Sequence, residues 1–146
     1  MSADISDPRL IRLSVAYETL HPARLDDLVS LYSEQAVFKD PFNEVRGRRA
    51  IKGVFSHMFK QIKEPRFTVL EGASNGYRGF LLWELRFLRD SGQTMAICGT
   101  SYLEYAPDGL VLVHRDYWDP VEEIFAKLPV LGSVARFLQK KLSASN

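Results

Sequence analysis

The apolar pattern of this chain changes its period at Pro65, and that change constrains the fold more than any other feature. Before Pro65, apolar side chains recur every three to four residues, as they do on one face of an α-helix. After Pro65 they alternate with polar ones, as they do in a half-buried β-strand. Helices that precede a run of strands, rather than alternating with them, predict an α+β domain with an antiparallel meander.

Three helices are expected before the change of period: one from Pro8, a short one over residues 25–32, and one from about Arg48 to Ile62. A proline in the first turn of a helix costs little, because its missing N–H would have no partner there. Residues 36–40 alternate like a strand that stops at Asp40-Pro41.

Four strands are expected after the change, over residues 67–71, 79–89, 94–105 and 110–118. Each is separated from the next by a turn sequence that contains glycine. Gly99 lies in the middle of the third of these strands and suggests a bend or a bulge there.

The composition is that of a soluble globular protein, and 146 residues fit one domain, 1–146. A net charge of +1, without a Lys/Arg block beside exposed aromatic residues, gives no argument for nucleic-acid binding. No apolar run reaches about 18 residues, so no transmembrane segment is expected. One cysteine, Cys98, cannot form an internal disulfide, and no signal peptide is recognisable, so a cytoplasmic location is expected.

The C-terminal residues 121–146 are expected to form a helical extension, with two helices interrupted at Pro129. The apolar rows of these helices suggest that they cover the mouth of the domain or pack on the sheet rim. Contact with a membrane surface or a partner is the alternative.

Three motifs occur in a characteristic order: Asp40-Pro41, the helix start Gly47-Arg48-Arg49-Ala50-Ile51, and the closing strand Asp116-Tyr117-Trp118-Asp119. From about Pro8 to Pro120 the chain therefore resembles the nuclear transport factor 2-like superfamily, with its ketosteroid isomerase-like, SnoaL-like polyketide cyclase-like and limonene epoxide hydrolase-like members. The resemblance implies a cystatin-like fold, in which a cone-shaped, strongly curved antiparallel sheet wraps around helices and leaves a pocket at its open end. It also implies a homodimer through the outer sheet face.

Two patterns of site residues follow from the resemblance. In the isomerases the carboxylate of the Asp-Pro pair moves the proton, which points to Asp40. The oxyanion donors of that pattern fall at Ala16 and Ser101, and Tyr17 is one position from the former, about 100° away on a helix. In the epoxide hydrolases an aspartate on the closing strand activates water, which points to Asp116.

The epoxide hydrolase pattern also needs an arginine and a second acid two residues apart on a neighbouring strand. Glu84 and Arg86 supply these types in the exchanged order. If Asp116 shares the inner face of the sheet with them, alternation also places His114 and Asp40 there. Three confined carboxylates against one guanidinium would raise the pKa of at least one carboxyl, as acid–base catalysis requires.

The residues expected to carry the chemistry are Asp40, Glu84, Arg86, Asp116 and His114. Those expected to bind the ligand are Phe38, Tyr17, Phe55, Met58, Leu82, Ser101 and Trp118. The opposite, dimer-forming face is expected to present Trp83, Leu85, Phe87, Tyr102 and Tyr117, because water does not favour so large an exposed aromatic patch.

Each site residue also has a structural interpretation. Glu84, Arg86 and Asp116 can form an inert buried ion-pair network, His114 can be a hydrogen-bonded core histidine, and Asp40 can simply end its strand. The scattered histidines give no metal-ligand spacing.

The favoured function is a cofactor-free acid–base enzyme, of isomerase or epoxide hydrolase type, acting on a small hydrophobic oxygen-bearing compound. Water addition to an epoxide-like ring has the better match of charges. The alternatives are a module that binds an apolar ligand without converting it and a dimeric interaction domain.

Overall fold

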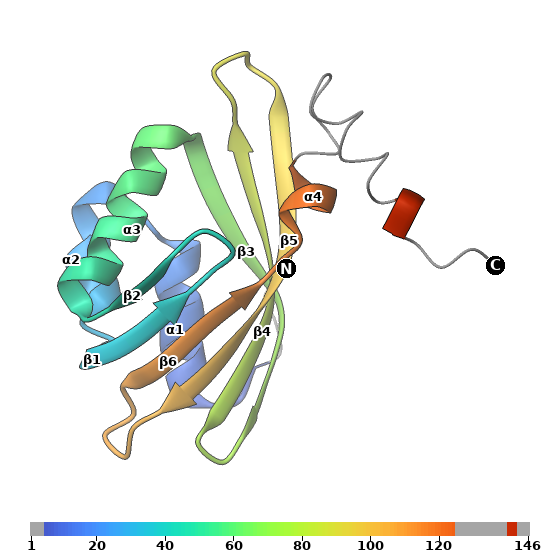
Figure 1. Cartoon of the computed structure of the whole chain (residues 1–146). Coiled ribbons are helices and arrows are strands. Elements are labelled where there is room, and N and C mark those ends of the chain that lie inside the picture. Colours follow the sequence, from blue (N-terminus) through green and yellow to red (C-terminus); the bar gives the residue numbers. More distant parts are fainter. Residues whose placement is uncertain (1–4, 125–139, 143–146) are drawn as a thin grey trace.

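A computed structural model describes residues 5–124 and 140–142. The helices are α1 (Pro8–Glu18), α2 (Leu25–Val29, after a 3-10 turn at Pro22–Arg24), α3 (Arg48–Gln61) and the short α4 (Pro120–Glu123). Figure 1 shows α1, α2 and α3 on one side of a curved sheet. The α+β architecture expected from the change of period is confirmed.

Six strands form one sheet in the order β2-β1-β6-β5-β4-β3. Their bounds are β1 Tyr32–Lys39, β2 Glu44–Arg46, β3 Lys63–Asn75, β4 Arg78–Leu88, β5 Thr94–Tyr105 and β6 Val111–Tyr117. All neighbouring pairs are antiparallel except β1 and β6, which are parallel. The sheet is therefore mixed, whereas the sequence predicts a wholly antiparallel sheet. The parallel pair joins the early strand β1 to the end of the meander and brings both halves of the chain together.

The expected helix over residues 25–32 is wrong at its end. The helix stops at Val29, and Tyr32 is already the first residue of β1, paired with Val111 of β6. Its helical spacing from Leu25 and Leu28 predicted a helix, but the long-range strand pairing prevails over that local period. Tyr32 is thereby buried completely, facing the interior.

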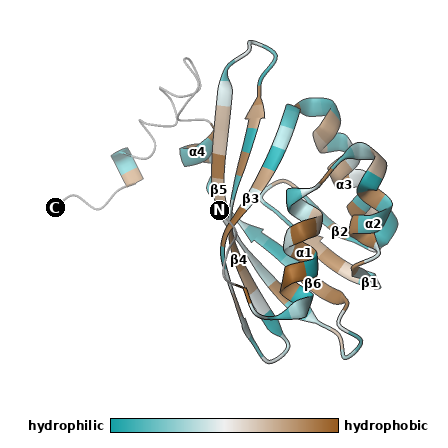
Figure 2. Cartoon of the chain, turned by 180° about the vertical axis from the view of Figure 1, so that it is seen from behind, coloured by the Kyte–Doolittle hydropathy of each residue, from teal (hydrophilic) through white to brown (hydrophobic). Residues whose placement is uncertain are grey.

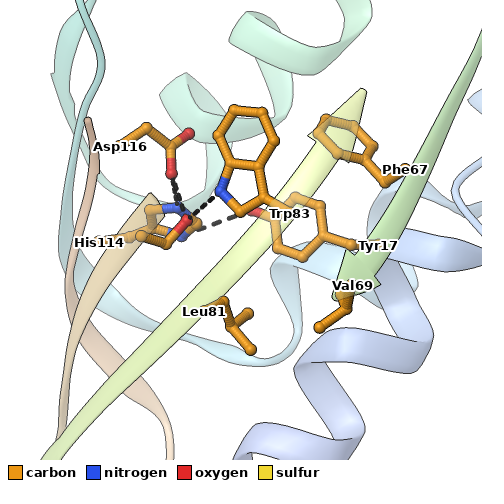
Figure 3. Close-up of a pocket in the computed structure, with 8 residues that line it drawn as sticks. Tyr17, Phe67, Val69, Leu81, Trp83, His114 and Asp116 are labelled. Carbon is orange, nitrogen blue, oxygen red and sulfur yellow. Dashed lines mark hydrogen bonds and ion pairs between the residues drawn. The ribbon is translucent and has the colours of Figure 1, made fainter. Parts of the chain in front are cut away.

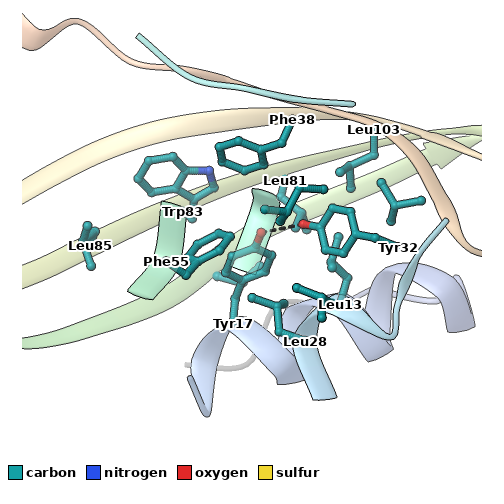
Figure 4. Packing of buried hydrophobic residues seen from close by; sticks show 14 of the residues in the cluster. Leu13, Tyr17, Leu28, Tyr32, Phe38, Phe55, Leu81, Trp83, Leu85 and Leu103 are labelled. Atoms are coloured by element: carbon teal, nitrogen blue, oxygen red, sulfur yellow. Dashed lines mark hydrogen bonds between the residues drawn. The ribbon is translucent and has the colours of Figure 1, made fainter. Parts of the chain in front are cut away.

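The core lies between the helices and the concave face of the sheet. Leu13 and Tyr17 of α1 and Phe55 of α3 pack toward Leu81 and Trp83 of β4 (Figure 4). Figure 2 shows apolar positions along α1 and along the strands that it faces. Burying a large apolar side chain stabilises the fold by about 1.5–3 kcal/mol. This layer therefore supplies much of the driving force for folding.

Two local features set the helices in place. Asp7 caps α1, because its Oδ1 accepts a hydrogen bond of 2.9 Å from the backbone N–H of Arg9, and Pro8 follows in the first turn. Gly47 precedes α3 with φ of 91°, a left-handed value that a side chain would disfavour.

Most of the predicted C-terminal extension cannot be compared with the structure. α4 covers the start of the predicted helix over residues 121–128, and residues 140–142 are helical. Residues 125–139 and 143–146 lie outside the described residues. Within the described part of the chain, no helix is long and apolar enough to cross a membrane.

Candidate active site

Three neighbouring strands bring polar side chains to one point on the concave face of the sheet. Ser101 of β5 lies opposite Leu81 of β4 on one side and opposite Asp116 of β6 on the other. Residues paired across a sheet share a face, so all three point into the interior. Alternation then places His114, two residues before Asp116, on the same face, as the sequence predicted.

Asp116 is held through one of its two carboxylate oxygens. Oδ1 accepts a hydrogen bond of 2.5 Å from Ser101 Oγ, and Nε2 of His114 lies 2.6 Å from the same atom. Ser101 Oγ in turn accepts a hydrogen bond of 2.9 Å from Trp83 Nε1. Oδ2 of Asp116 has no hydrogen-bond donor among the residues that the structure describes. Figure 3 shows Asp116, His114 and Trp83 turned toward one another at this point.

Two tyrosines continue the network behind His114. Nδ1 of His114 lies 2.6 Å from the Tyr32 hydroxyl, which lies 2.6 Å from the Tyr17 hydroxyl. Burial raises the pKa of Tyr17 well above its usual value, and the neighbouring Tyr32 and Asp116 add to the effect. Burial likewise raises the pKa of Tyr32. Both phenols are therefore protonated at neutral pH.

Trp83 reaches this network because the residue beside it on β5 is a glycine. A Cβ added to Gly99 would lie only 2.5 Å from Cζ2 of the Trp83 indole. The indole thus occupies the space that a side chain at position 99 would fill. The expected role of Gly99 was a bend or bulge, whereas in the structure the β4–β5 register runs through it without a shift.

An apolar cavity of about 390 Å³ opens in front of Asp116, between α3 and the concave face of the sheet. Its walls are mostly aromatic and aliphatic, which is typical of small-molecule sites. No lysine or arginine is among the described residues that line it. The aromatic residues that line it are Phe38, Phe42, Phe55, Phe67, Trp83, Phe87 and Trp118.

A smaller space of about 10 Å³ lies beside the network, lined by Tyr17, Ser101, His114 and Asp116 among others (Figure 3). That volume has room for about one water molecule.

Asp40 also lines the large cavity, but its carboxylate is engaged by its own turn. Oδ1 accepts hydrogen bonds from the backbone N–H groups of Phe42 and Asn43, at 2.8 and 2.6 Å. The side-chain amide of Asn43 lies 3.0 Å from each carboxylate oxygen. This local pattern, in which an Asp side chain binds the backbone of the following residues, is common in turns. It fits the structural interpretation of Asp40.

The expected convergence of Glu84 and Arg86 with Asp116 is wrong. Leu81 and Trp83 of β4 are buried on the inner face, so Glu84 and Arg86, of opposite parity, point to the outer face. There, Nε of Arg86 lies 2.6 Å from Oε1 of Glu84, and the Arg86 side chain is 62% exposed. Leu82 shares their face and does not line the cavity.

The same parity corrects the expected dimer face. Trp83, Leu85 and Phe87 are buried on the inner face, where burial removes these large apolar side chains from water. Tyr102 and Tyr117 do lie on the outer face, and Tyr117 is half exposed. A homodimer through this face stays a prediction.

Of the other residues expected to bind ligand, Phe38, Phe55, Met58 and Trp118 line the large cavity, and Tyr17 and Ser101 line the small space. Tyr32, Trp83 and Phe67 also belong to the site and were not predicted there, Tyr32 because its spacing in the sequence predicts a helix. The signal for Trp83 was Gly99 at the middle of the next strand. No group of three or more His, Cys, Asp and Glu that could hold a metal ion occurs in the described part of the chain.

Comparison with known proteins identifies a family whose model the sequence matches. Residues 15–114 match the SnoaL-like domain. No protein among the curated ones matches the chain.

The chain is also similar to solved structures of the NTF2-like fold. One is a protein with a ketosteroid isomerase-like fold from Catenulispora acidiphila, in complex with trimethylamine. Its TM-score is 0.73 and its identity 15%, over 86% of this chain and 96% of that chain. Another is an NTF2-like protein of unknown function from Burkholderia pseudomallei, with a TM-score of 0.72 and 16% identity, over 82% and 96% of the two chains.

A third is RV0760c from Mycobacterium tuberculosis, in complex with estradiol-17beta-hemisuccinate. The TM-score is 0.65 and the identity 18%, over 78% of this chain and 95% of that chain. At these identities the likeness shows the fold, which is the one that the sequence predicted.

Proposed function

The chain belongs to the SnoaL-like domain family, and we propose that it is a cofactor-free acid–base enzyme in which Asp116 is the general base. The observation that carries the proposal is the hydrogen bonding of Asp116 at the wall of an apolar cavity. His114 and Ser101 hold its Oδ1, while Oδ2 has no donor among the described residues. A carboxylate fixed in this way is available to accept a proton from a bound molecule.

The proposed reaction is proton transfer at a carbon next to a carbonyl group. Oδ2 of Asp116 takes the proton, the electron pair of the broken C–H bond moves into an enolate, and the proton returns to the same or another carbon. Atoms and charges balance without an oxidant or a second substrate. Water addition to an epoxide has lost its support, because Glu84 and Arg86 lie on the opposite face of the sheet.

The lining of the cavity supports a small, mostly apolar substrate that carries no negative charge. Asp116 and Asp40 lie in the walls, and His57 is the one described lining side chain that can carry a positive charge, so an anionic ligand would meet more negative than positive charge. The volume of about 390 Å³ is within the usual range for small-molecule sites.

The test is hydrogen–deuterium exchange, followed by NMR in D₂O, on a panel of small cyclic ketones and enones. Asp116→Asn keeps the shape of the side chain but removes the base, so we expect at least about a 100-fold loss of exchange rate. The matched control is Glu84→Gln, which neutralises a carboxylate on the opposite face and should change the rate less than about threefold. Equal loss in both variants, or no loss in either, would contradict the proposal.

Ligand binding without conversion is the second candidate, favoured by the apolar lining of the cavity. Two structural neighbours were solved with small organic molecules, trimethylamine and estradiol-17beta-hemisuccinate. Native mass spectrometry separates the two candidates. Panel members that bind the wild-type chain but exchange no deuterium in its presence would favour binding alone.

A further inference from the structure

We infer that Trp83 positions Asp116 through Ser101, and that Gly99 on the neighbouring strand makes this placement of the indole possible. Trp83 is then a positioning residue as well as a part of the cavity wall. The inference rests on the proposed function only for the role of Asp116 as the base. It adds that the geometry of this base depends on a side chain two strands away.

The direction of the two hydrogen bonds follows from the groups involved. An indole N–H can only donate, so Trp83 Nε1 donates to Ser101 Oγ at 2.9 Å. The Ser101 hydroxyl keeps its own hydrogen, which it donates to Oδ1 of Asp116 at 2.5 Å. In Figure 3 the indole nitrogen of Trp83 is turned toward Asp116. The donors therefore run from β4 through β5 to the carboxylate on β6.

The N–H of Trp83 restricts the hydroxyl of Ser101. A serine hydroxyl rotates to suit its partners. Because the indole N–H occupies one lone pair of Oγ, the hydroxyl hydrogen points away from the indole and is left for Asp116. A hydroxyl that accepts a hydrogen bond is also a stronger donor, since bonds in a chain polarise one another. A carboxylate is rigid, so a fixed Oδ1 restricts the position of Oδ2 as well.

Gly99 leaves the space that the indole needs. Trp83 and Gly99 are directly paired across β4 and β5, and both lie on the inner face. A Cβ at position 99 would lie 2.5 Å from Cζ2 and 2.6 Å from Cη2 of the indole. Two non-bonded carbon atoms attract most strongly at roughly 3.5–4.0 Å, so a side chain here would displace the ring. Nε1 belongs to the same rigid ring system and would move away from Ser101 with it.

The same indole contacts the space in which a ligand would bind. Trp83 lines the cavity of about 390 Å³ and the smaller space beside Asp116. Substitutions of Trp83 therefore change both the wall that a ligand touches and the hydrogen bond to Ser101. A test has to separate these two effects, which a comparison of kcat with KM and a spectroscopic signal of the N–H both do.

The first experiment follows the indole N–H of Trp83 by ¹⁵N NMR in the full-length protein. The chain contains two tryptophans, and the signal lost in Trp83→Phe is that of Trp83. In Ser101→Ala the N–H loses its acceptor, so its proton signal should move upfield and its exchange with solvent should become roughly 2- to 13-fold faster. Gly99→Ala should change the signal in the same direction, because it moves the indole away from the hydroxyl.

Gly53→Ala is the matched control for Gly99→Ala. Gly53 lies on α3, and a Cβ added there has no atom within 4 Å, so the Trp83 signal should stay as in wild type. A Trp83 signal that is unchanged in Ser101→Ala, or that responds to Gly53→Ala as strongly as to Gly99→Ala, would overturn the inference.

The second experiment is a double-mutant cycle on the kcat of deuterium exchange. Trp83→Phe keeps an aromatic ring in the wall but removes the N–H, so kcat should fall roughly 2- to 13-fold whatever happens to KM. Ser101→Ala removes a hydrogen bond to a charged group, so kcat should fall roughly 10- to 150-fold. If Trp83 acts through Ser101, adding Trp83→Phe to Ser101→Ala should lower kcat by less than about twofold more. A full further loss would contradict the inference.

A second cycle tests the role of Gly99 and does not depend on the folding of the single variant. The smaller ring in Trp83→Phe leaves room for a methyl group at position 99. Gly99→Ala should therefore lower kcat by less than about twofold in the Trp83→Phe background, although it lowers kcat in the wild-type chain at least as much as Trp83→Phe does. Equal losses in the two backgrounds would show that Gly99 does not act through the indole.

This inference and the proposed function fail separately. If the Trp83 signal responds as expected while Asp116→Asn still exchanges deuterium at the wild-type rate, this inference stands and the proposed function falls. If Asp116→Asn loses exchange while Trp83→Phe leaves kcat unchanged, the proposed function stands and this inference falls. In a chain that exchanges no deuterium on the panel, the NMR signal alone decides this inference.

Discussion

Asp40 and Asp116 line the same cavity, yet the fold holds them in different ways. Among the described residues, the carboxylate of Asp40 bonds only to groups within three positions along the chain, and both of its oxygens have partners. Asp116 is held by Ser101 from the next strand and by His114, whose own partner Tyr32 is 82 residues away in sequence. One oxygen of Asp116 has no donor in the described part of the chain.

The carboxylate of Asp40 therefore stabilises its own turn, whereas the carboxylate of Asp116 is held in place by the fold. The turn of Asp40 forms from a short sequence and would form on many folds. The position of Asp116 requires the register of three strands and the docking of α1 and β1. A buried carboxylate such as that of Asp116 needs hydrogen-bond partners, and each of those buried polar partners needs hydrogen bonds of its own. This contrast predicts how strongly each region responds to substitution.

The largest effect is expected for His114→Ala. The substitution leaves a cavity and removes the partner of Tyr32 and one partner of Asp116, so the free energy of unfolding should fall by about 3–5 kcal/mol. Urea denaturation followed by circular dichroism measures it. His57→Ala, at an exposed position on α3, is the control and should change stability by less than about 0.5 kcal/mol. A loss for His114→Ala as small as that of the control would show that the network does little to hold the fold.

A smaller effect is expected for Asp40→Ala. Loss of the hydrogen bonds in its turn should cost about 1 kcal/mol, as the loss of a helix-capping side chain does. Deuterium exchange on the ketone panel should stay within about threefold of wild type, because Asp116 supplies the base. If Asp40→Ala lowered exchange as much as Asp116→Asn does, the contrast between the two carboxylates would be wrong, and Asp40 would share the chemistry.

The sequence predicted the fold class because the change of period at Pro65 is long and regular. The strand over residues 94–105 was predicted with the bounds that the structure has. Tyr32 was missed because its position fits a helical period, and only the pairing of β1 with β6 makes it a strand residue. A long-range parallel pair leaves no local signal in the sequence.

The candidate site was predicted in part. Alternation placed His114, Asp116 and Trp118 on one face, and they do lie there. Alternation assigned the residues of β4 to two faces but could not say which face is inside. The match of charges to the epoxide hydrolases favoured the assignment of Glu84 and Arg86 to the inner face.

The energetics of packing favours the opposite orientation of β4, with Glu84 and Arg86 on the outer face. Burying Trp83, Leu85 and Phe87 stabilises the fold by about 1.5–3 kcal/mol for each residue. Burying Glu84 and Arg86 instead would remove two charges from water, at a cost that their attraction often fails to offset. The strand therefore turns its aromatic and aliphatic side chains inward and leaves the ion pair on the outer face.

Arg86→Gln gives the smallest expected effect and tests this orientation. The Glu84–Arg86 ion pair lies on the outer face with Arg86 mostly exposed, so its loss should change the free energy of unfolding by about 0.5 kcal/mol or less. Exchange on the ketone panel should change less than about twofold, because Arg86 touches neither Asp116 nor the cavity. An arginine that oriented Asp116 inside the site would behave differently, because its loss would leave a buried carboxylate unpaired and lower both stability and exchange. A large loss of exchange in Arg86→Gln would therefore place Arg86 at the site and reverse the assignment of faces on β4.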